Sequence, residues 1–291
     1  MMLKLESIVF SDSNGKTYDI RKRQIESFPL IGGESANWIS TESWNQHGNT
    51  PLNALMQPFD GELIFIIHTG FLKPEEIAQE RRRITNICNP LNGTVKMTVN
   101  LNDGSTYHRD ITFTSAPFFP IGFENRNSEW QKVQLLYSAN NPFWYAETEI
   151  TESFQGVEPL FLFPFTMSPT TPVVFGNIIP SNIAINEGQV SAPVVIEIKG
   201  ACVNPKIENE TTGEFIAFKD LVMAAEDVLV IDTTFGQKKV ELNNENVFNK
   251  LDFESTFFNL QIGENSIDFS DETGSTETTI HFIYKNLYIT I

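Results

Sequence analysis

Cysteine and histidine are scarce in this sequence of 291 residues, which contains two of the first and four of the second. Cys88 and Cys202 stand far apart with no CxxC spacing, so the sequence indicates neither a disulfide framework nor a structural zinc site. We expect two free thiols in a reducing compartment. The histidines form no close pair and no HExxH motif, so no metal and no other cofactor is expected.

Sequence signatures of catalysis are missing as well. There is no Gly-x-Ser-x-Gly elbow, no P-loop and no GxGxxG after a strand. Asp227, Asp232, Asp268 and Asp271 lack the dense spacing of a calcium loop. Carboxylates are plentiful, but the pair that a glycosidase needs cannot be read from spacing. We therefore predict that the protein is not an enzyme, with glycoside hydrolysis the last of the function classes considered.

Long hydrophobic runs are also absent. The longest, residues 63–67 and 221–225, are far shorter than a membrane span. The first ten residues alternate in polarity and include Lys4 and Glu6, which does not fit a secretory signal. We expect a protein made inside the cell, without a classical export signal and without a membrane partner.

Positive charge is scarce, especially in the second half of the chain. The sequence has 20 Lys and Arg against 37 Asp and Glu, and residues 150–291 hold 7 of the former and 20 of the latter. A surface this acidic repels phosphate backbones, so specific binding of nucleic acid is not expected.

Alternation of apolar and polar residues, punctuated by Gly, Asn, Asp and Pro, is the dominant pattern and indicates an all-β fold of sandwich or barrel type. Residues 3–20 are predicted to form an N-terminal hairpin. Turn residues at 212–213, 235–237 and 271–274 predict further hairpins. The alternation over 278–291 predicts a closing strand or strand pair.

One amphipathic helix is predicted at about residues 74–88. It starts with Pro and Glu and carries Arg later, the charge order that a helix dipole favours. Ile84, Ile87 and Cys88 share one face with Ile77, which would pack on a sheet, and Asn89-Pro90 ends the helix.

The helix also carries the run Arg81, Arg82 and Arg83. Consecutive helical residues fan over roughly 200° of the cylinder, and glutamates 76 to 80 offer intrahelical partners. We therefore predict solvated or intersubunit salt bridges for these arginines rather than a phosphate site.

An aromatic and proline-rich stretch at residues 140–172 marks a domain boundary near residue 150. The expected domains are residues 1–149 and 150–291. The sheet edges, the Gly32-Gly33 region and residues 37–53 are candidate docking surfaces, and Trp38 and Trp44 are candidate intersubunit contacts. Residues 37–53 predict a long ordered loop or β-arm, or a segment folded back within its own domain.

Phenylalanines near residue 255 raise the alternative of sugar binding, because sugar faces stack on exposed rings. Strand alternation places Phe253 and Phe257 on one face and Phe258 and Leu260 on the other, so one set must be core. A carbohydrate-binding module that recognises host cell-wall polysaccharide is therefore kept as the alternative function.

The most specific pattern is an ordered set of β segments and turns in the second half. Its segments are 193–200, 204–209, 211–214, 228–233 and 255–267, with Asn209, Ile231-Asp232-Thr233 and Leu260-x-x-Gly263-x-Asn265-x-Ile267 as its motifs. The first half adds Asn14-Gly15, Tyr18-Asp19-Ile20 and Asn141-Pro142-Phe143-Trp144. This order resembles the distal tail proteins of long-tailed, non-contractile bacteriophages and prophages.

The resemblance implies two β-sandwich domains, an N-terminal one related to tail tube subunits and a galectin-like C-terminal one. It implies a structural hub in the virion tail tip, assembled in the host cytoplasm, that forms a homohexameric ring through which DNA passes without specific binding. The implied partners are the tail tube protein, a tail tip or tail-associated lysin protein and receptor-binding proteins. No inserted carbohydrate-binding module fits in this length, so the resemblance implies a simple hub.

Overall fold

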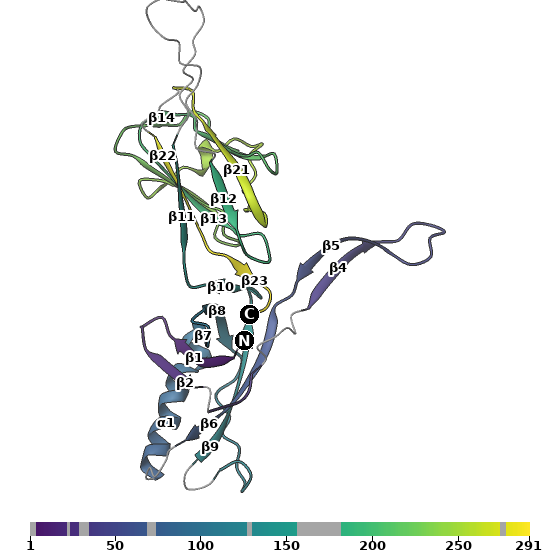
Figure 1. Ribbon diagram of the computed structural model, residues 1–291, viewed down its shortest axis with the longest axis vertical. Coiled ribbons are helices and arrows are strands. Elements are labelled where there is room, and N and C mark those ends of the chain that lie inside the picture. Colours follow the sequence, from purple (N-terminus) through teal and green to yellow (C-terminus); the bar gives the residue numbers. More distant parts are fainter. Residues whose placement is uncertain are drawn as a thin grey trace, which may run out of the picture. The chain divides into compact units, whose positions relative to one another are not determined.

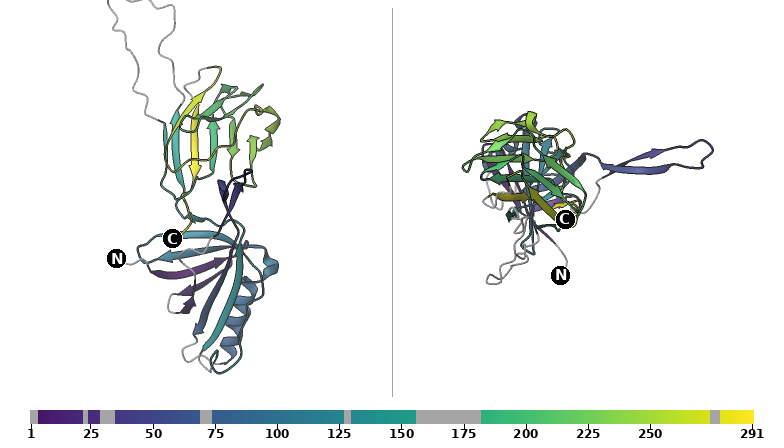
Figure 2. Two further views of the ribbon diagram at one scale, coloured as in Figure 1. Left: turned by 90° about the vertical axis from the view of Figure 1, so that its right-hand side faces the viewer. Right: turned by 90° about the horizontal axis from the view of Figure 1, so that it is seen from above.

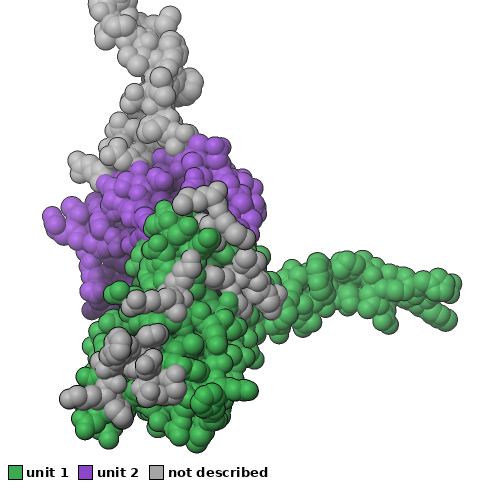
Figure 3. Space-filling view, turned by 60° about the horizontal axis from the view of Figure 1, so that its bottom comes forward, with its two compact units in different colours: residues 1–147, 288–291 green, residues 148–287 purple. Residues whose placement is uncertain are grey.

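The computed structural model describes residues 4–21, 24–28, 35–68, 74–126, 130–155, 182–273 and 278–291. The chain divides into two compact units, which we call unit 1 (residues 1–147 and 288–291) and unit 2 (residues 148–287) (Figures 1 and 3). The last four residues thus return to unit 1. The Gly32-Gly33 region and residues 156–172 of the aromatic, proline-rich stretch lie outside the described residues.

Unit 1 consists of β-strands and one α-helix. Its elements are β1 (Leu5–Ser11), β2 (Thr17–Arg21), β3 (Ile25–Ser27), β4 (Ala36–Thr41), β5 (Thr50–Met56), β6 (Phe59–His68), α1 (Pro74–Ile87), the short 3-10 helix η2 (Pro90–Asn92), β7 (Thr94–Leu101), β8 (Thr106–Phe113), β9 (Trp130–Ala139) and β10 (Trp144–Ala146). The described strands of its main sheet follow the order β2-β1-β7-β8-β9-β6-β3, and β10 pairs with β8 and with β23 (Leu287–Tyr288). The predicted N-terminal hairpin is confirmed as β1 and β2.

The main sheet of unit 1 curls so that its two ends face each other. Tyr18 in β2 and Phe65 in β6 lie near opposite ends of the strand order, yet their ring centres are 6.2 Å apart. Phe10 in β1 and Phe113 in β8 make an edge contact at 5.4 Å. All four rings belong to one buried cluster, so the curled sheet encloses the core as a sandwich does.

Helix α1 covers one side of this core and confirms the predicted helix (Figure 2). Ile84, Ile87 and Cys88 are buried, as the apolar stripe requires. At the C-terminal end the Asn92 amide donates to the carbonyls of Asn86 at 2.7 Å and Ile87 at 3.3 Å. These bonds satisfy carbonyls that the end of a helix leaves open. No helix within the described ranges is long and apolar enough to cross a membrane.

Unit 2 is a two-sheet β-sandwich. Its elements are β11 (Ile150–Gln155), β12 (Ile183–Asn186), β13 (Val194–Lys199), β14 (Cys202–Val203), β15 (Lys206–Asn209), β16 (Glu214–Ala217), β17 (Val222–Met223), β18 (Val228–Asp232), β19 (Lys239–Leu242), β20 (Glu245–Asn246), the 3-10 helix η3 (Phe248–Lys250), β21 (Gly263–Ser270) and β22 (Thr279–Tyr284). The larger described sheet has the order β11-β22-β13-β18-β19-β20 and the smaller β12-β21-β15-β16. Alternate residues of both sheets fill one core.

The hairpins predicted at residues 212–213 and 235–237 are confirmed as β15–β16 and β18–β19. The hairpin predicted at 271–274 is wrong. Strand β21 pairs with β12 and β15, whereas β22 pairs with β11 and β13, so the chain crosses from one sheet to the other there. The strands at the C-terminus, β22 and β23, likewise do not pair with each other among the described residues.

Two fully buried asparagines join the motif segments of unit 2. The Asn209 amide donates to Asn265 Oδ1 at 3.1 Å. Asn265 also donates to the carbonyls of Gln261 at 2.9 Å and Gly263 at 3.1 Å, and accepts from the Gln261 N–H at 2.9 Å. Gly263 has a φ of +92°, which favours glycine. The motif residues therefore build the turn into β21 and bind it to the end of β15.

Candidate functional site

The structure gathers no metal-binding or nucleophilic cluster in the part of the chain it describes. No group of three or more His, Cys, Asp or Glu side chains converges there. Cys88 and Cys202 are free and buried. Burial raises the pKa of the Cys88 thiol, and burial together with Asp271 raises that of Cys202 to about 12. Both thiols therefore stay protonated and poorly nucleophilic at neutral pH.

Two of the histidines make strand-to-strand contacts. His108 Nδ1 lies 3.2 Å from the Glu147 carboxylate, which also accepts from Lys96 Nζ at 3.0 Å. His281 Nδ1 lies 2.9 Å from Ser153 Oγ across the β11–β22 pair. These contacts join segments that are neighbours in the two sheets.

Unit 1 carries a β-hairpin, β4 with β5, that extends from its body; we call it the arm (Figure 3). Every side chain of β4 is exposed. Trp38 is 65% exposed, and Trp44 at the turn is 101% exposed. The predicted segment at 37–53 thus takes the form of a β-arm, and it places both predicted tryptophans in solvent.

The arm presents apolar side chains on both faces. Trp38 stands opposite Ala54, and the next residue, Ile39, stands opposite Asn53, so the two side chains point to opposite faces. Leu55 is exposed too. Tryptophan and aliphatic side chains are thus exposed on both faces of a thin hairpin, a composition that is typical of interaction surfaces.

The arginines of α1 face different neighbours. The Arg81 guanidinium lies 4.5 Å from the centre of the Phe119 ring. Arg83 lies 3.7 Å from the Glu80 carboxylate, and Arg82 is exposed. The three positive charges therefore do not point to one common site. Arg81 lies beside the loop that follows β8.

That loop is a second exposed apolar surface, which the sequence analysis missed. Phe118, Ile121 and Phe123 are all exposed, Phe123 at 94%. The loop is nevertheless ordered against β9, because Phe118 and Gln134 exchange backbone hydrogen bonds of 2.9 and 3.0 Å. The signal was present in the run Pro117-Phe118-Phe119-Pro120-Ile121, where two prolines prevent a regular strand around large apolar residues. We call residues 117–123 the apolar loop.

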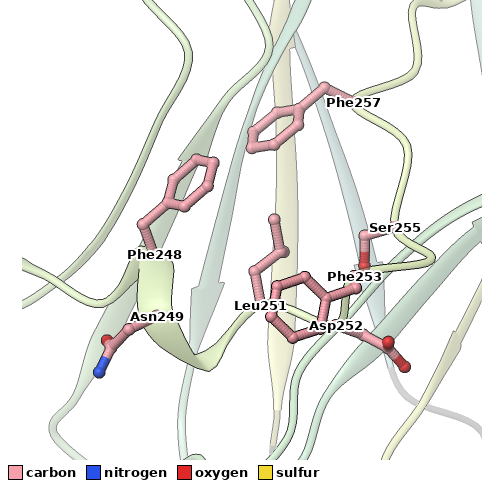
Figure 4. A pocket seen from close by; sticks show the side chains of 7 residues that line it. All are labelled: Phe248, Asn249, Leu251, Asp252, Phe253, Ser255 and Phe257. Carbon is pink, nitrogen blue, oxygen red and sulfur yellow. The ribbon is translucent and has the colours of Figure 1, made fainter.

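Unit 2 contains an aromatic cleft of about 360 Å³ beside η3 (Figure 4). Phe253 is fully exposed, whereas Phe258 and Leu260 are buried, so the prediction that one set must be core is confirmed. The rings of Phe248 and Phe257 are nearly parallel, 12° apart in plane and 5.9 Å between centres. The residues that line the cleft are Phe248, Asn249, Leu251, Asp252, Phe253, Ser255 and Phe257.

The chain is similar to known proteins both in the sequence of its second half and in its fold. Residues 187–287 match the family of the siphovirus-type tail component, C-terminal domain. The chain is similar in structure to the Dit protein of phage SPP1, described as a hub adsorption apparatus in phages that infect Gram-positive hosts, with 9% identity, a TM-score of 0.63 and coverage of 96% of this chain and 98% of that one. No curated protein matches the sequence.

A second structural relative comes from a phage baseplate. The chain is similar to one in the activated baseplate of phage p2, with 11% identity, a TM-score of 0.51 and full coverage of both chains. Identities this low show a shared fold, here along the whole length. The domain match within unit 2 confirms the resemblance to distal tail proteins that the motifs indicated.

Proposed function

We propose that this chain is the distal tail hub of a siphophage or prophage, a structural protein that acts by assembly and not by catalysis. Six copies form a ring that joins the tail tube to the tail tip or tail-associated lysin protein and to receptor-binding proteins. The tail-component domain at residues 187–287 carries the proposal, and the hub fold along the whole chain supports it. In this proposal unit 1 is the tube-like, ring-forming domain and unit 2 the galectin-like one.

The exposed surfaces of unit 1 suit a head-to-tail ring. The arm and the apolar loop are different surfaces of one chain, and each exposes large apolar side chains. Contact between two different surfaces is heterologous, and such contacts close into rings when the rotation between copies allows it. Burying Trp38 of one copy against Phe123 of the next would remove both from water. Arg81, whose guanidinium lies over the Phe119 ring of the loop, would lie at the edge of this contact.

The charge of the chain suits a conduit for DNA. Most of the formal net charge of −17 lies in residues 150–291, and residues 1–149 hold the remaining 13 Lys and Arg against 17 Asp and Glu. The proposed ring-forming part thus has a small excess of acidic side chains, which does not favour binding of phosphate groups. DNA would then slide through without specific contacts. Assembly takes place in the host cytoplasm, and the finished hub resides in the virion tail tip.

The proposal is tested by absolute mass from light scattering after size exclusion, with negative-stain images of the same peak. The expected result is a particle of six 32.9 kDa chains with a central hole. A strict monomer at high concentration, alone and with the cognate tube protein, would count against the ring.

A further inference from the structure

We infer that the aromatic cleft of unit 2, lined by Phe248, Leu251, Phe253 and Phe257, binds a neutral pyranose sugar. The inference goes beyond the hub function, because a ring that joins tube and tip needs no small-molecule site. It rests on the construction of the cleft, on the order of its apolar and polar groups and on the charge of the unit around it.

The cleft is built in advance of any ligand. Its outer wall, residues 252–257, is fastened to β16 by backbone bonds of 2.8 Å from Asp252 N–H to the Ala217 carbonyl and from Thr256 N–H to the Phe215 carbonyl. Ser255 Oγ bonds both the N–H and the carbonyl of Ala217, at 3.0 and 3.2 Å. A wall held at these points loses little freedom when a ligand binds, so weak individual contacts suffice.

The interior is apolar and the rim is polar. Figure 4 shows the rings of Phe248 and Phe257 on two sides of Leu251, with Phe253 next to it. Phe253 is 104% exposed, so its whole ring face is open to a ligand. The polar ends of Asn249 and Asp252 turn outward at the edge (Figure 4). A pyranose has the same division, with C–H groups on its face and hydroxyls around its edge.

Asp252 is equipped to accept hydroxyl hydrogens. Its carboxylate lies 2.9 Å from Lys219 Nζ and accepts from the Glu254 N–H at 3.3 Å. The Lys219 hydrogen bond is the largest cause of a lowered Asp252 pKa, so the group is ionised at neutral pH. An ionised carboxylate makes stronger hydrogen bonds to hydroxyls than a neutral acceptor does.

The charged and polar groups of unit 2 favour a neutral sugar over the other classes of ligand that an aromatic cleft could bind. Residues 150–291 carry 20 acidic against 7 basic side chains, which repels anionic polyol phosphates. Two lysines beside the cleft are engaged, Lys219 with Asp252 and Lys238 over the Phe257 ring at 5.4 Å, and a third, Lys250, stands in η3 between the lining residues Asn249 and Leu251. An entirely apolar peptide would cover Asn249 and Asp252 without hydrogen bonds, at a cost in desolvation.

The test is saturation-transfer difference NMR on the full chain, which reports weak ligands even on a large assembly. The probes are glucose, galactose, rhamnose and N-acetylglucosamine, with glycerol phosphate oligomer and a leucine-rich peptide as the other two classes. We expect saturation transfer to the ring C–H protons of at least one neutral sugar. Phe253→Ala should lower the affinity for that sugar about tenfold. Asp252→Asn should also lower the affinity while leaving the shape of the cleft intact.

Phe235→Ala is the matched control, because Phe235 is an exposed phenylalanine of unit 2 that does not line the cleft. The variant should bind as the wild type does. The inference is overturned if no neutral sugar receives transfer, if only the anionic oligomer or the peptide does, or if Phe235→Ala loses as much affinity as Phe253→Ala. None of these results bears on the ring, which the mass measurement tests separately.

Discussion

The guanidinium of Arg109 lies 4.2 Å from the centre of the Trp144 indole ring, inside the core of unit 1. Phe59 flanks the same guanidinium, with its ring centre 5.1 Å away. A cation desolvated between aromatic faces interacts more strongly than one at the surface. The pair fastens β8 to the short strand β10, after which the chain passes into unit 2.

Trp144→Ala should lower the free energy of unfolding of unit 1 by about 3–5 kcal/mol, because it opens a cavity and removes the ring from the buried guanidinium. Chemical denaturation followed by circular dichroism measures this change. Trp44→Ala is the control, since Trp44 is fully exposed on the arm. It should stay within about 0.5 kcal/mol of the wild type, and an equal loss in both variants would contradict the role given to Trp144.

Asn265→Ala should destabilise unit 2 by roughly 3 kcal/mol. The substitution leaves buried partners without hydrogen bonds, among them the Asn209 amide and the Gln261 carbonyl. Urea unfolding measures the stability of Asn265→Ala. Gln237→Ala, a change at an exposed turn residue, is the control. Equal stability of the two variants would show that the asparagine pair contributes nothing.

Trp38→Ser with Trp44→Ser should abolish self-association of the full chain without changing the stability of the monomer. Both side chains lie in solvent, so their removal costs no core packing. Light scattering gives the mass and thermal unfolding gives the stability. If the double variant keeps the wild-type mass, the arm is not the ring contact.

Lowering the pH should reduce the free energy of unfolding of unit 2, in part because Asp227 becomes protonated. A hydrogen bond from the Ala224 N–H, with one from Asn243, lowers the pKa of this carboxyl below its ordinary value of 3.8. A lowered folded-state pKa gives stability that is present above the unfolded value and lost as pH falls through the folded one. Asp227→Asn should therefore destabilise unit 2 at about pH 6, and the difference from the wild type should shrink as the pH falls below 3.8. Urea unfolding at a series of pH values measures this, and a difference that stays constant would refute the assignment.

Cys88 and Cys202 should resist a thiol reagent in the native protein and react fully after denaturation. Both are buried, and their raised pKa values leave almost no thiolate at neutral pH. Absorbance of the released aromatic thiol counts the reactive groups. Rapid labelling of either cysteine without denaturant would contradict its buried position.

Local signals in the sequence were sufficient for the helix and for the tight hairpins. Pro74 and the isoleucine stripe define α1, and Gly213 and Gly236 mark turns whose strands pair with each other. The crossing at residues 271–273 has similar turn residues, yet its flanking strands pair with distant partners. Long-range pairing decides that outcome, and turn chemistry does not encode it.

The candidate surfaces were predictable to different degrees. Trp38 and Trp44 stood out because tryptophans in a polar segment have no core to fill. The apolar loop was missed, since the composition of 117–123 is equally suited to a buried segment. The aromatic cleft could not be predicted from the sequence. The alternation around Phe257 divides the side chains into two sets, and only the structure shows which set is buried and which is exposed.

The path of the backbone between the units has a mechanical consequence. The chain leaves unit 1 after Glu147 and comes back at Tyr288, whose ring packs against Tyr107 at 5.2 Å. Unit 2 therefore has one covalent link to the body of unit 1, at residues 147–148, and a second attachment that is non-covalent, through the strand pairing and packing of residues 288–291. A pull exerted on unit 2 loads the backbone at the first attachment and the hydrogen bonds and ring contact at the second. A tag fused to the C-terminus, finally, would report on unit 1 and not on unit 2.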